Sequence, residues 1–235
     1  MKFNEKKCNI LHLGRKKNSH FYQLNGIVLE SVSQAKYLGV TISDNLSWSP
    51  HISAISSKAH QRLEFLKRNL RGSPFKCRAL AYTSLVRSQV DYCASIWDPT
   101  LKRDINELER VQRKAARWVK GCVYGEVSVT GLLRDLKWQS LADRRRDQRL
   151  TLLYKILFNY INIPPESVDI HYSNRTPRGD KNPLNLNRPS ASRKSSPLWT
   201  SSIYRTIPEW NSLPASFAEA DSVTAFKSQL ASRSP

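Results

Sequence analysis

The stretch DINELERVQRKAARWVK, residues 104–120, decides the fold class of this chain. Residues suited to one buried side recur every three or four positions, the period of an α-helix that packs on a core: Ile105, Leu108, Gln112, Ala115 and Val119. Acids occupy the first turns and bases the last ones, as the helix dipole favours. Two interpretations are open: a core helix with a solvated outer side, or a helix that presents a cationic surface to a polyanion.

The charge of the whole chain bears on that choice. Lysine and arginine number 38 against 19 acids, which gives a formal net charge of +19. So many positive charges repel one another in a compact protein, so an anionic partner is expected. Nucleic acid is the commonest candidate, and the anionic face of a membrane is the second.

Targeting signals of the usual kinds are missing from the sequence. No apolar run approaches the roughly 20 residues that span a bilayer. The opening MKFNEKKCNILHLG has too short an apolar segment for a secretory signal. We therefore expect an intracellular protein, nuclear or cytoplasmic, that does not associate with membranes.

The cysteines and histidines are scattered. Cys8, Cys77, Cys93 and Cys122 form no Cys-x-x-Cys pair, and the five histidines are equally dispersed. Zinc sites usually draw their ligands from closely spaced Cys and His. We expect reduced structural or surface cysteines and no metal site.

The first 48 residues predict a small antiparallel β-region. Asn25-Gly26 lies between apolar runs and indicates a tight hairpin, because both turn residues need positive φ. Lys36–Ser43 (KYLGVTIS) predicts one further strand, in which Gly39 permits close backbone approach or a bulge. So small a β-region is expected to be one edge of something larger.

Residues 49–120 predict a compact three-helix bundle, so the chain is α+β and mainly α. Ser49 is expected to cap a first helix ahead of Pro50 and Gly72 to end it. A second helix is expected from Ser73-Pro74 to Trp97, bent near Ser88. The third is the helix quoted above.

The exposed sides of these helices are strongly basic. Between Lys58 and Arg87 the only acid is Glu64. A solvated surface normally mixes charges of both signs, so here the nucleic-acid interpretation is favoured. The candidate phosphate contacts are Lys58, Arg62, Lys67, Arg68, Arg110, Arg113, Lys114 and Arg117.

Residues 121–162 predict a helical extension. A short helix is expected at Ser128–Leu136, and Ser140 with Asp143 resembles a capping box that starts a helix through Tyr160. The densest basic cluster of the chain follows at Arg144, Arg145, Arg146 and Arg149. Two roles for it are open: phosphate binding, with Arg144 and Arg145 as candidates, or a solvated turn paired with Asp143 and Asp147.

The remainder divides into a polar, basic linker and a short terminal segment. Residues 163–196 are rich in Asn, Ser, Pro and Arg, which predicts loop or disorder, because such a composition buries little apolar surface. Residues 197–235 predict a return to order and a final helix capped by Ser222.

Residues for nucleic-acid chemistry are not apparent. Two-metal phosphoryl transfer needs converging carboxylates, yet the acids here lie among bases on predicted helices. The sequence has no Walker-type glycine-rich loop and no Gly-x-Ser-x-Gly motif. From its residues alone, the chain is expected to bind nucleic acid without cutting or polymerising it.

A series of motifs resembles the C-terminal part of a LINE-like (non-LTR, jockey-like) retrotransposon reverse transcriptase. Asn4–Cys8 is similar to the signature that follows that family's Tyr-x-Asp-Asp motif, and Lys7 lies within it. Six more motifs follow in the family's order: Tyr37-Leu38-Gly39-Val40 of the primer-gripping hairpin, Trp48–Ile52 at the entry to the thumb, the segment Tyr82–Trp97, Leu108–Arg117 in a thumb helix, and Trp210–Pro214 and Phe226-Lys227 near the end. Ser88 departs from the pattern, because the family commonly has proline there.

The resemblance implies a division into five parts. Residues 1–48 would be the palm edge with the primer-grip-like hairpin, 49–120 the thumb-like bundle and 121–162 a C-terminal extension. Residues 163–196 would be the linker and 197–235 the closing segment. Tyr37, Leu38 and Gly39 would support the primer's 3′ end, and the thumb bases would hold a primer–template duplex by its phosphates.

The resemblance also implies that catalytic parts are missing. Both metal-binding aspartate motifs would lie upstream of Met1, so Mg²⁺ is expected only for the intact polymerase and this chain has no cofactor of its own. Lys7 matches a lysine sometimes assigned as proton donor to pyrophosphate, a role that is idle without those aspartates. The chain alone is expected to be inactive, although it resembles RNA-directed DNA polymerases.

Three functional hypotheses follow. The chain is a polymerase fragment that contributes primer–template binding, an independent non-enzymatic module that binds RNA or an RNA–DNA hybrid without sequence preference, or a non-functional remnant of a truncated element. The reading frame upstream of Asn4 distinguishes the first from the last. The sequence does not indicate an oligomeric state.

Overall fold

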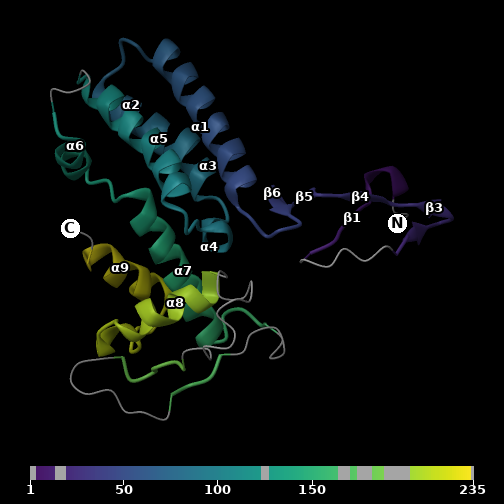
Figure 1. Cartoon of the computed structure of the whole chain (residues 1–235). Helices are drawn as coiled ribbons and strands as arrows, with labels where there is room; N and C mark the ends of the chain where they lie inside the picture. Colours follow the sequence, from purple (N-terminus) through teal and green to yellow (C-terminus); the bar gives the residue numbers. More distant parts are fainter. Residues whose placement is uncertain are drawn as a thin grey trace.

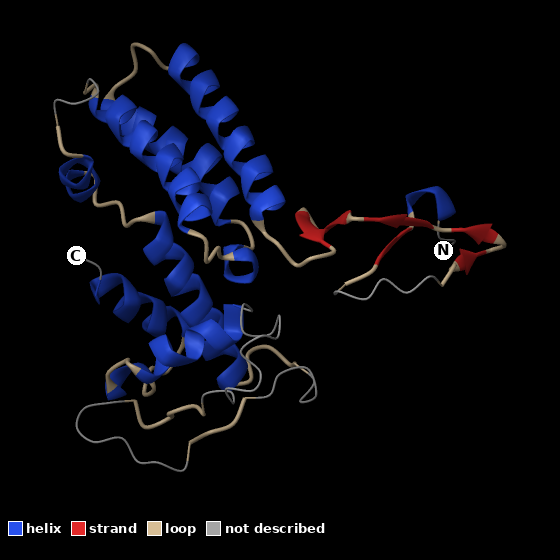
Figure 2. Ribbon diagram, viewed as in Figure 1, coloured by secondary structure: helices blue, strands red, loops and turns tan. Residues whose placement is uncertain are grey.

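The computed structural model describes residues 4–13, 20–122, 127–163, 170–173, 182–187 and 202–233. Helices make up most of it, and the N-terminal strands extend away from them as an arm (Figure 1, Figure 2). The arm holds the 3-10 helix η1 (Glu5–Lys7) and six strands, β1 (Asn9–Leu11), β2 (Gln23–Leu24), β3 (Ile27–Val28), β4 (Glu30–Val32), β5 (Gln34–Tyr37) and β6 (Val40–Ser43). No helix in these ranges is both long and apolar enough to cross a membrane.

The helical part begins with α1. Its α-helices are α1 (Ser49–Asn69), α2 (Phe75–Ala81), α3 (Ser88–Asp91), α4 (Ala94–Trp97), α5 (Lys102–Lys120), α6 (Val129–Asp135), α7 (Leu141–Leu157), α8 (Ser202–Asn211) and α9 (Val223–Arg233). A π-helical turn, η2 (Tyr82–Arg87), joins α2 to α3, and a 3-10 turn, η6 (Ala215–Phe217), precedes α9. A mainly helical chain with a few short strands agrees with the expected class.

The strands pair in twos. β2 with β3 and β5 with β6 are antiparallel, whereas β1 runs parallel to β4 with Asn9 opposite Glu30 and Leu11 opposite Val32. The prediction of a wholly antiparallel region is therefore wrong at β1. Parallel neighbours need a long crossover, and the stretch between Leu11 and Glu30, which contains the β2–β3 hairpin, provides one.

The two hairpins follow from backbone conformation. Asn25 and Gly26 have φ of 51° and 79°, which confirms the predicted tight turn. Lys36–Ser43 is not one strand, because Leu38 and Gly39 have φ of 45° and 87° and turn the chain into β5 and β6. A Cβ added at Gly39 would lie 3.4 Å from the Tyr92 ring, an ordinary contact distance, so glycine is favoured here by its positive φ.

Helices α1 and α5 pack along each other in the first hydrophobic cluster (Figure 1). Leu108, Ala115 and Val119 are fully buried as predicted, while Ile105 is half-buried. Gln112 is fully buried too, and its amide bridges neighbours: Tyr82 donates to its oxygen and its nitrogen donates to the Gln139 carbonyl at 2.8 Å. The cluster is completed by apolar residues of β6, α1, η2, α3, α4 and α7.

The start of α1 differs from its prediction. Trp48, not Ser49, precedes the helix as its cap residue, and no side chain caps it. The Ser49 hydroxyl instead donates to Asp104 Oδ2 at 2.6 Å. Because Asp104 lies in the first turn of α5 and is buried, this bond holds the starts of α1 and α5 together.

The predicted second helix is interrupted twice. The irregularity expected near Ser88 is the π-helical turn that ends at Arg87. A break follows at Cys93, whose φ of 52° is left-handed, so Trp97 belongs to the separate helix α4. The Trp97 ring is fully buried and its Nε1 donates to the Tyr92 carbonyl at 2.9 Å.

Helix α7 contributes to both hydrophobic clusters. The Asp143 amide donates to Ser140 Oγ at 3.0 Å and that hydroxyl donates to Asp143 Oδ2 at 2.7 Å, which confirms Ser140 as the cap. The helix ends at Leu157, short of the predicted Tyr160. Its first residue, Leu141, joins the first cluster, and residues further along join the second with α8 and α9.

The C-terminal segment is held by asparagine side chains. Residues 182–187 fall in the stretch predicted as loop or disorder, yet Asn182 is fully buried and its amide nitrogen donates to the Trp210 carbonyl at 3.3 Å. Asn211 bonds the backbone of Leu186 in both directions. The Ser222 hydroxyl accepts from the Ala225 amide at 3.1 Å, which confirms the cap of α9. The linker bases, including Arg175 and Arg188, lie outside the described residues.

A buried carboxylate, Asp98, joins the two clusters. Its oxygens lie 2.7 Å from Arg145 Nε and 2.9 Å from Arg149 Nε on α7, and 3.4 Å from an Arg205 nitrogen on α8. Arg205 also donates to the Asp98 carbonyl at 2.8 Å. Three elements far apart in sequence therefore depend on one side chain.

His51 ties the arm to the helices. Its Nδ1 accepts from the Thr41 amide of β6 at 3.2 Å, and its ring meets Trp97 edge-on at 5.3 Å. Burial lowers the pKa of His51 below its ordinary value, and Lys36 and Lys58 add to the effect. The neutral imidazole is therefore the form that fits this position.

We expect Asp98→Asn to lower the free energy of unfolding by about 3–5 kcal/mol, because it leaves the buried Arg145 guanidinium without its counter-charge. Urea unfolding measures the change. The matched control is Asp135→Asn, which removes an exposed pair with Lys120 (3.4 Å) and is expected to change stability by about 1 kcal/mol or less. Equal losses in the two variants would contradict the role given to Asp98.

Acidification is expected to destabilise the fold through His51. In the unfolded chain a histidine takes up a proton near pH 6.5, whereas the folded chain binds that proton only at lower pH, so stability falls as the pH drops from 7.5 to 5.5. Thermal melting across this range should show a shallower dependence for His51→Gln than for the natural chain. His20→Gln, at an exposed position, is the control and should keep the natural slope.

Candidate nucleic-acid interface

Helix α5 presents a basic outer side because two of its three acids point inward. Asp104 and Glu109 are buried, whereas Arg110, Arg113 and Lys114 are exposed and Arg117 is half-buried. Glu109 accepts from the Ala142 amide at 2.8 Å and so caps the first turn of α7. The sequence analysis explained these acids by the helix dipole and did not predict their burial. A charged residue beside the apolar stripe of a helix was the available signal.

One edge of this outer side meets α1. Lys114 Nζ lies 2.8 Å from Glu64 Oε1 and Lys67 Nζ lies 3.1 Å from the same oxygen. Hydrogen bonding from Lys114 is the main reason that the pKa of Glu64 lies below its ordinary value. Lys67, Arg110 and Lys114 outnumber the two acids whose charges reach this seam, Glu64 and Glu107, so the seam keeps a net positive charge.

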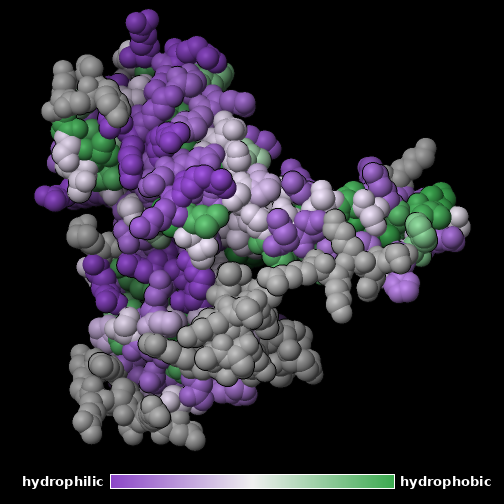
Figure 3. Space-filling view, viewed as in Figure 1, coloured by the Kyte–Doolittle hydropathy of each residue, from purple (hydrophilic) through white to green (hydrophobic). Residues whose placement is uncertain are grey.

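His60 lies at the same seam. Burial lowers the pKa of His60, and the charges of Lys114 and Arg110 lower it further. We define the α1–α5 face as Lys67, Arg110 and Lys114. The space-filling view shows a mostly hydrophilic surface over these helices, in contrast to the apolar patches of the arm (Figure 3).

The remaining candidate bases of α1 lie apart from that face. Lys58 and Arg62 are one turn apart, and Arg62 donates to the Leu85 carbonyl at 3.2 Å, so this side of α1 turns toward η2. Arg68 is exposed. The structure therefore does not gather all the predicted bases on one surface.

The other edge of α5 lines a cleft. Arg113 and Arg117 face the space between α5 and the segment of α6 and α7, together with Arg144. Successive residues of a helix are turned by about 100°, so Arg113 and its neighbour Lys114 point to different sides. Arg87, Arg134 and Lys137 also line this cleft. The site prediction left these three out, and no motif or spacing marks Arg134 or Lys137.

The arginines of α7 have separate partners. Arg145, with a side chain 2% exposed, lies in the interior beside Asp98, where a phosphate does not reach it. Arg144 pairs with Asp91 at 2.6 Å. Arg146 alone pairs with Asp143 and Asp147, at 3.3 and 3.4 Å. Neither a single phosphate site nor a solvated turn describes the whole cluster.

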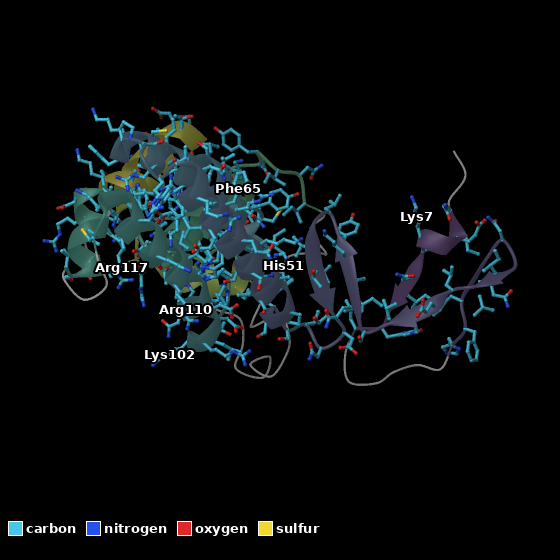
Figure 4. The ribbon with its side chains drawn as sticks, turned by 90° about the horizontal axis from the view of Figure 1, so that it is seen from above. Lys7, His51, Phe65, Lys102, Arg110 and Arg117 are labelled. Carbon is cyan, nitrogen blue, oxygen red and sulfur yellow. The ribbon has the colours of Figure 1, made fainter. Side chains whose placement is uncertain are left out.

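The candidates on the arm are far from the helical bases. Tyr37 and Leu38 are 67% and 72% exposed at the turn of the β5–β6 hairpin. Lys7 is exposed in η1, well away from Arg110 and Arg117 (Figure 4). Across the described ranges, no group of three or more His, Cys, Asp or Glu side chains is placed to hold a metal ion.

Known proteins give two similarities to this chain. It is 33% identical over 125 residues to a probable RNA-directed DNA polymerase from transposon BS of Drosophila melanogaster, a match that covers 52% of this chain and 14% of that protein. It is 24% identical over 148 residues to the RNA-directed DNA polymerase from mobile element jockey of the same organism, over 61% of this chain and 16% of that protein.

The chain thus spans a small part of the length of these relatives. No family model matches it. No solved structure matches it either. Both relatives belong to the class that the motifs from Asn4 to Pro214 indicate. The chain is similar to a segment of each of these two RNA-directed DNA polymerases, which agrees with the resemblance to non-LTR, jockey-like retrotransposon reverse transcriptases.

Proposed function

We propose that this chain is the part of a non-LTR retrotransposon reverse transcriptase that holds the primer–template duplex. Residues 1–48 form the palm edge, 49–120 the thumb and 121–162 its C-terminal extension, followed by the linker 163–196 and the closing segment 197–235. The catalytic aspartates are not part of this chain. The proposal combines the homology with the basic surface of α1 and α5.

The α1–α5 face is the observation that carries the proposal. Lys67 and Lys114 share the single carboxylate of Glu64, and Arg110 is exposed beside them. Because the buried acids of α5 leave its outer side basic, a row of cations lies on an open helical surface. Such a surface suits the phosphates of a duplex, which position the protein without specifying sequence.

The β5–β6 hairpin is the second element that we assign to primer binding. Tyr37 and Leu38 are exposed at its turn, and the turn is held by Tyr92, whose hydroxyl donates to the Leu38 carbonyl at 3.1 Å. We propose that Tyr37, Leu38 and Gly39 contact the primer's 3′ end, as in the family hairpin that they resemble. Lys7 has no catalytic role in this chain.

The duplex proposal is tested by Arg110→Gln/Lys114→Gln. We expect the natural chain to bind an RNA–DNA hybrid with a steep salt dependence, and the double variant to lose about 1.8 from the slope of log affinity against log salt, taking about 0.9 per phosphate contact. Filter binding over a salt series measures both slopes. Lys155→Gln/Lys227→Gln, on α7 and α9, removes the same charge away from the face and should keep the natural slope.

Glu64→Gln tests the α1–α5 face by a change that is expected to strengthen hybrid binding. Removing this carboxylate releases Lys67 and Lys114 from a competing partner, so hybrid affinity should rise at low salt. The thermal melting temperature should change little, because the carboxylate is 43% exposed. Weaker hybrid binding by Glu64→Gln would count against the α1–α5 face.

We expect the purified 235-residue chain to extend no primer on an RNA or DNA template with Mg²⁺. Two-metal catalysis needs converging carboxylates, and the proposal places them outside this chain. A gel assay of labelled primer, with an active reverse transcriptase as positive control, gives the result. Template-dependent extension would overturn the assignment of this chain as a non-catalytic part.

A further inference from the structure

A large basic cleft is separate from the α1–α5 face, and none of the three residues of that face lines it. It has a volume of about 1270 Å³ and lies between α5 on one side and α6, the following turn and the start of α7 on the other. Its lining bases come from four elements and the turn after α6, and they are Arg87, Arg113, Arg117, Arg134, Lys137 and Arg144.

The two acids of this cleft are engaged within the protein. Glu109 accepts from the Ala142 amide at 2.8 Å, and Asp143 pairs with Arg146 at 3.3 Å. Because Glu109 and Ser140 satisfy the first amides of α7, the end of that helix is not itself an anion site. The positive charge of the cleft comes from its side chains.

The turn after α6 holds a lysine in an unfavourable conformation. The Trp138 amide donates to the Leu133 carbonyl at 2.8 Å and the Lys137 amide to the Arg134 carbonyl at 2.9 Å, the pattern of a Schellman motif. The residue in its left-handed position is usually glycine, yet here it is Lys137 with φ of 53°. Backbone strain retained at a charged residue of a cleft points to a function for that residue.

An aromatic ring lies beside these bases. Trp138 is half-buried: it lines the cleft and also packs on the first hydrophobic cluster, where its ring is 4.7 Å from the ring of Tyr82 at an interplanar angle of 30°. Basic grooves with an aromatic side chain are typical of surfaces that bind single-stranded nucleic acid, where phosphates follow the bases and nucleobases stack.

We propose that the cleft between α5 and α6–α7 binds a single strand of RNA or DNA. Its volume exceeds that of most small-molecule pockets, which favours a polymer. The cleft has walls on two sides, so a single strand can lie between them. A duplex is wider and presents its phosphates to an open surface, so it does not enter. Arg134 and Lys137 contact phosphates, and Trp138 stacks on a base. The inference stands whether or not the α1–α5 face holds a duplex.

Arg134→Gln/Lys137→Gln tests the cleft in the full chain. Both side chains are exposed, and no ion pair joins either to another described residue. At about 0.1 M salt, affinity for an unstructured single-stranded oligonucleotide should fall about 25-fold, and the salt slope should fall by about 1.4, at about 0.7 per contact. Affinity for a blunt RNA–DNA hybrid should stay the same. Arg110→Gln/Lys114→Gln is the matched control, and we expect it to bind the single-stranded oligonucleotide as tightly as the natural chain does.

Lys137→Gly separates binding from folding. Glycine relieves the left-handed strain, so the melting temperature should rise while single-strand affinity falls about fivefold, the loss of one phosphate contact. A purely structural role for Lys137 predicts the first change without the second. That result would overturn the proposal.

Two further outcomes decide the class of ligand. A single-stranded oligonucleotide carrying 4-thiouridine should cross-link to the peptide that contains Trp138 in the natural chain, a readout that does not depend on a variant folding. Cross-linking only elsewhere, or an equal loss of hybrid and single-strand affinity in Arg134→Gln/Lys137→Gln, overturns the inference. The inference is also overturned if a poly-glutamate peptide of matched charge binds as tightly as the oligonucleotide and if Arg134→Gln/Lys137→Gln abolishes that binding.

Discussion

The structure depends on which side of helix α5 is buried. Its apolar stripe and two of its acids share one side, so burying Leu108, Ala115 and Val119 also carries Asp104 and Glu109 into the interior. There Asp104 accepts a hydrogen bond from Ser49 of α1, and Glu109 caps the first turn of α7. The bases have no place inside, and the outer side of the helix is left cationic. Core packing and surface charge are thus two results of one helical register.

The parts of the fold that sequence predicts well are those with a local cause. Asn25-Gly26 forms its turn because both residues adopt positive φ, and Ser140 caps α7 through its own side chain. Predictions fail where a partner distant in the sequence decides the position of a side chain. Ser49 bonds Asp104 in place of its own helix, and Arg145 lies inside because Asp98 is there to meet it. No spacing in the sequence reveals those pairs.

The same reasoning applies to the candidate surfaces. Periodicity indicates correctly that Arg110, Arg113 and Lys114 are exposed, whereas Arg117 is half-buried. It does not say that α1 meets one edge of α5 while α6 and α7 approach the other. That division depends on how the later helices pack around Asp98 and Glu109. The cleft is consequently a product of tertiary structure, and Lys137 is recognisable only from its backbone conformation.

The arm has a further consequence for local stability. In the part of it that the structure describes, strands β1 to β4 bury no side chain, and each sheet has two strands. Two-stranded sheets are marginal in water, so the outer strands open at little free-energy cost and their amides exchange with solvent first. The β5–β6 hairpin exchanges more slowly, because Tyr92 and His51 anchor it to the helices. Such an arm gains rigidity only when another surface packs against its exposed residues, among them Phe21, which is 86% exposed.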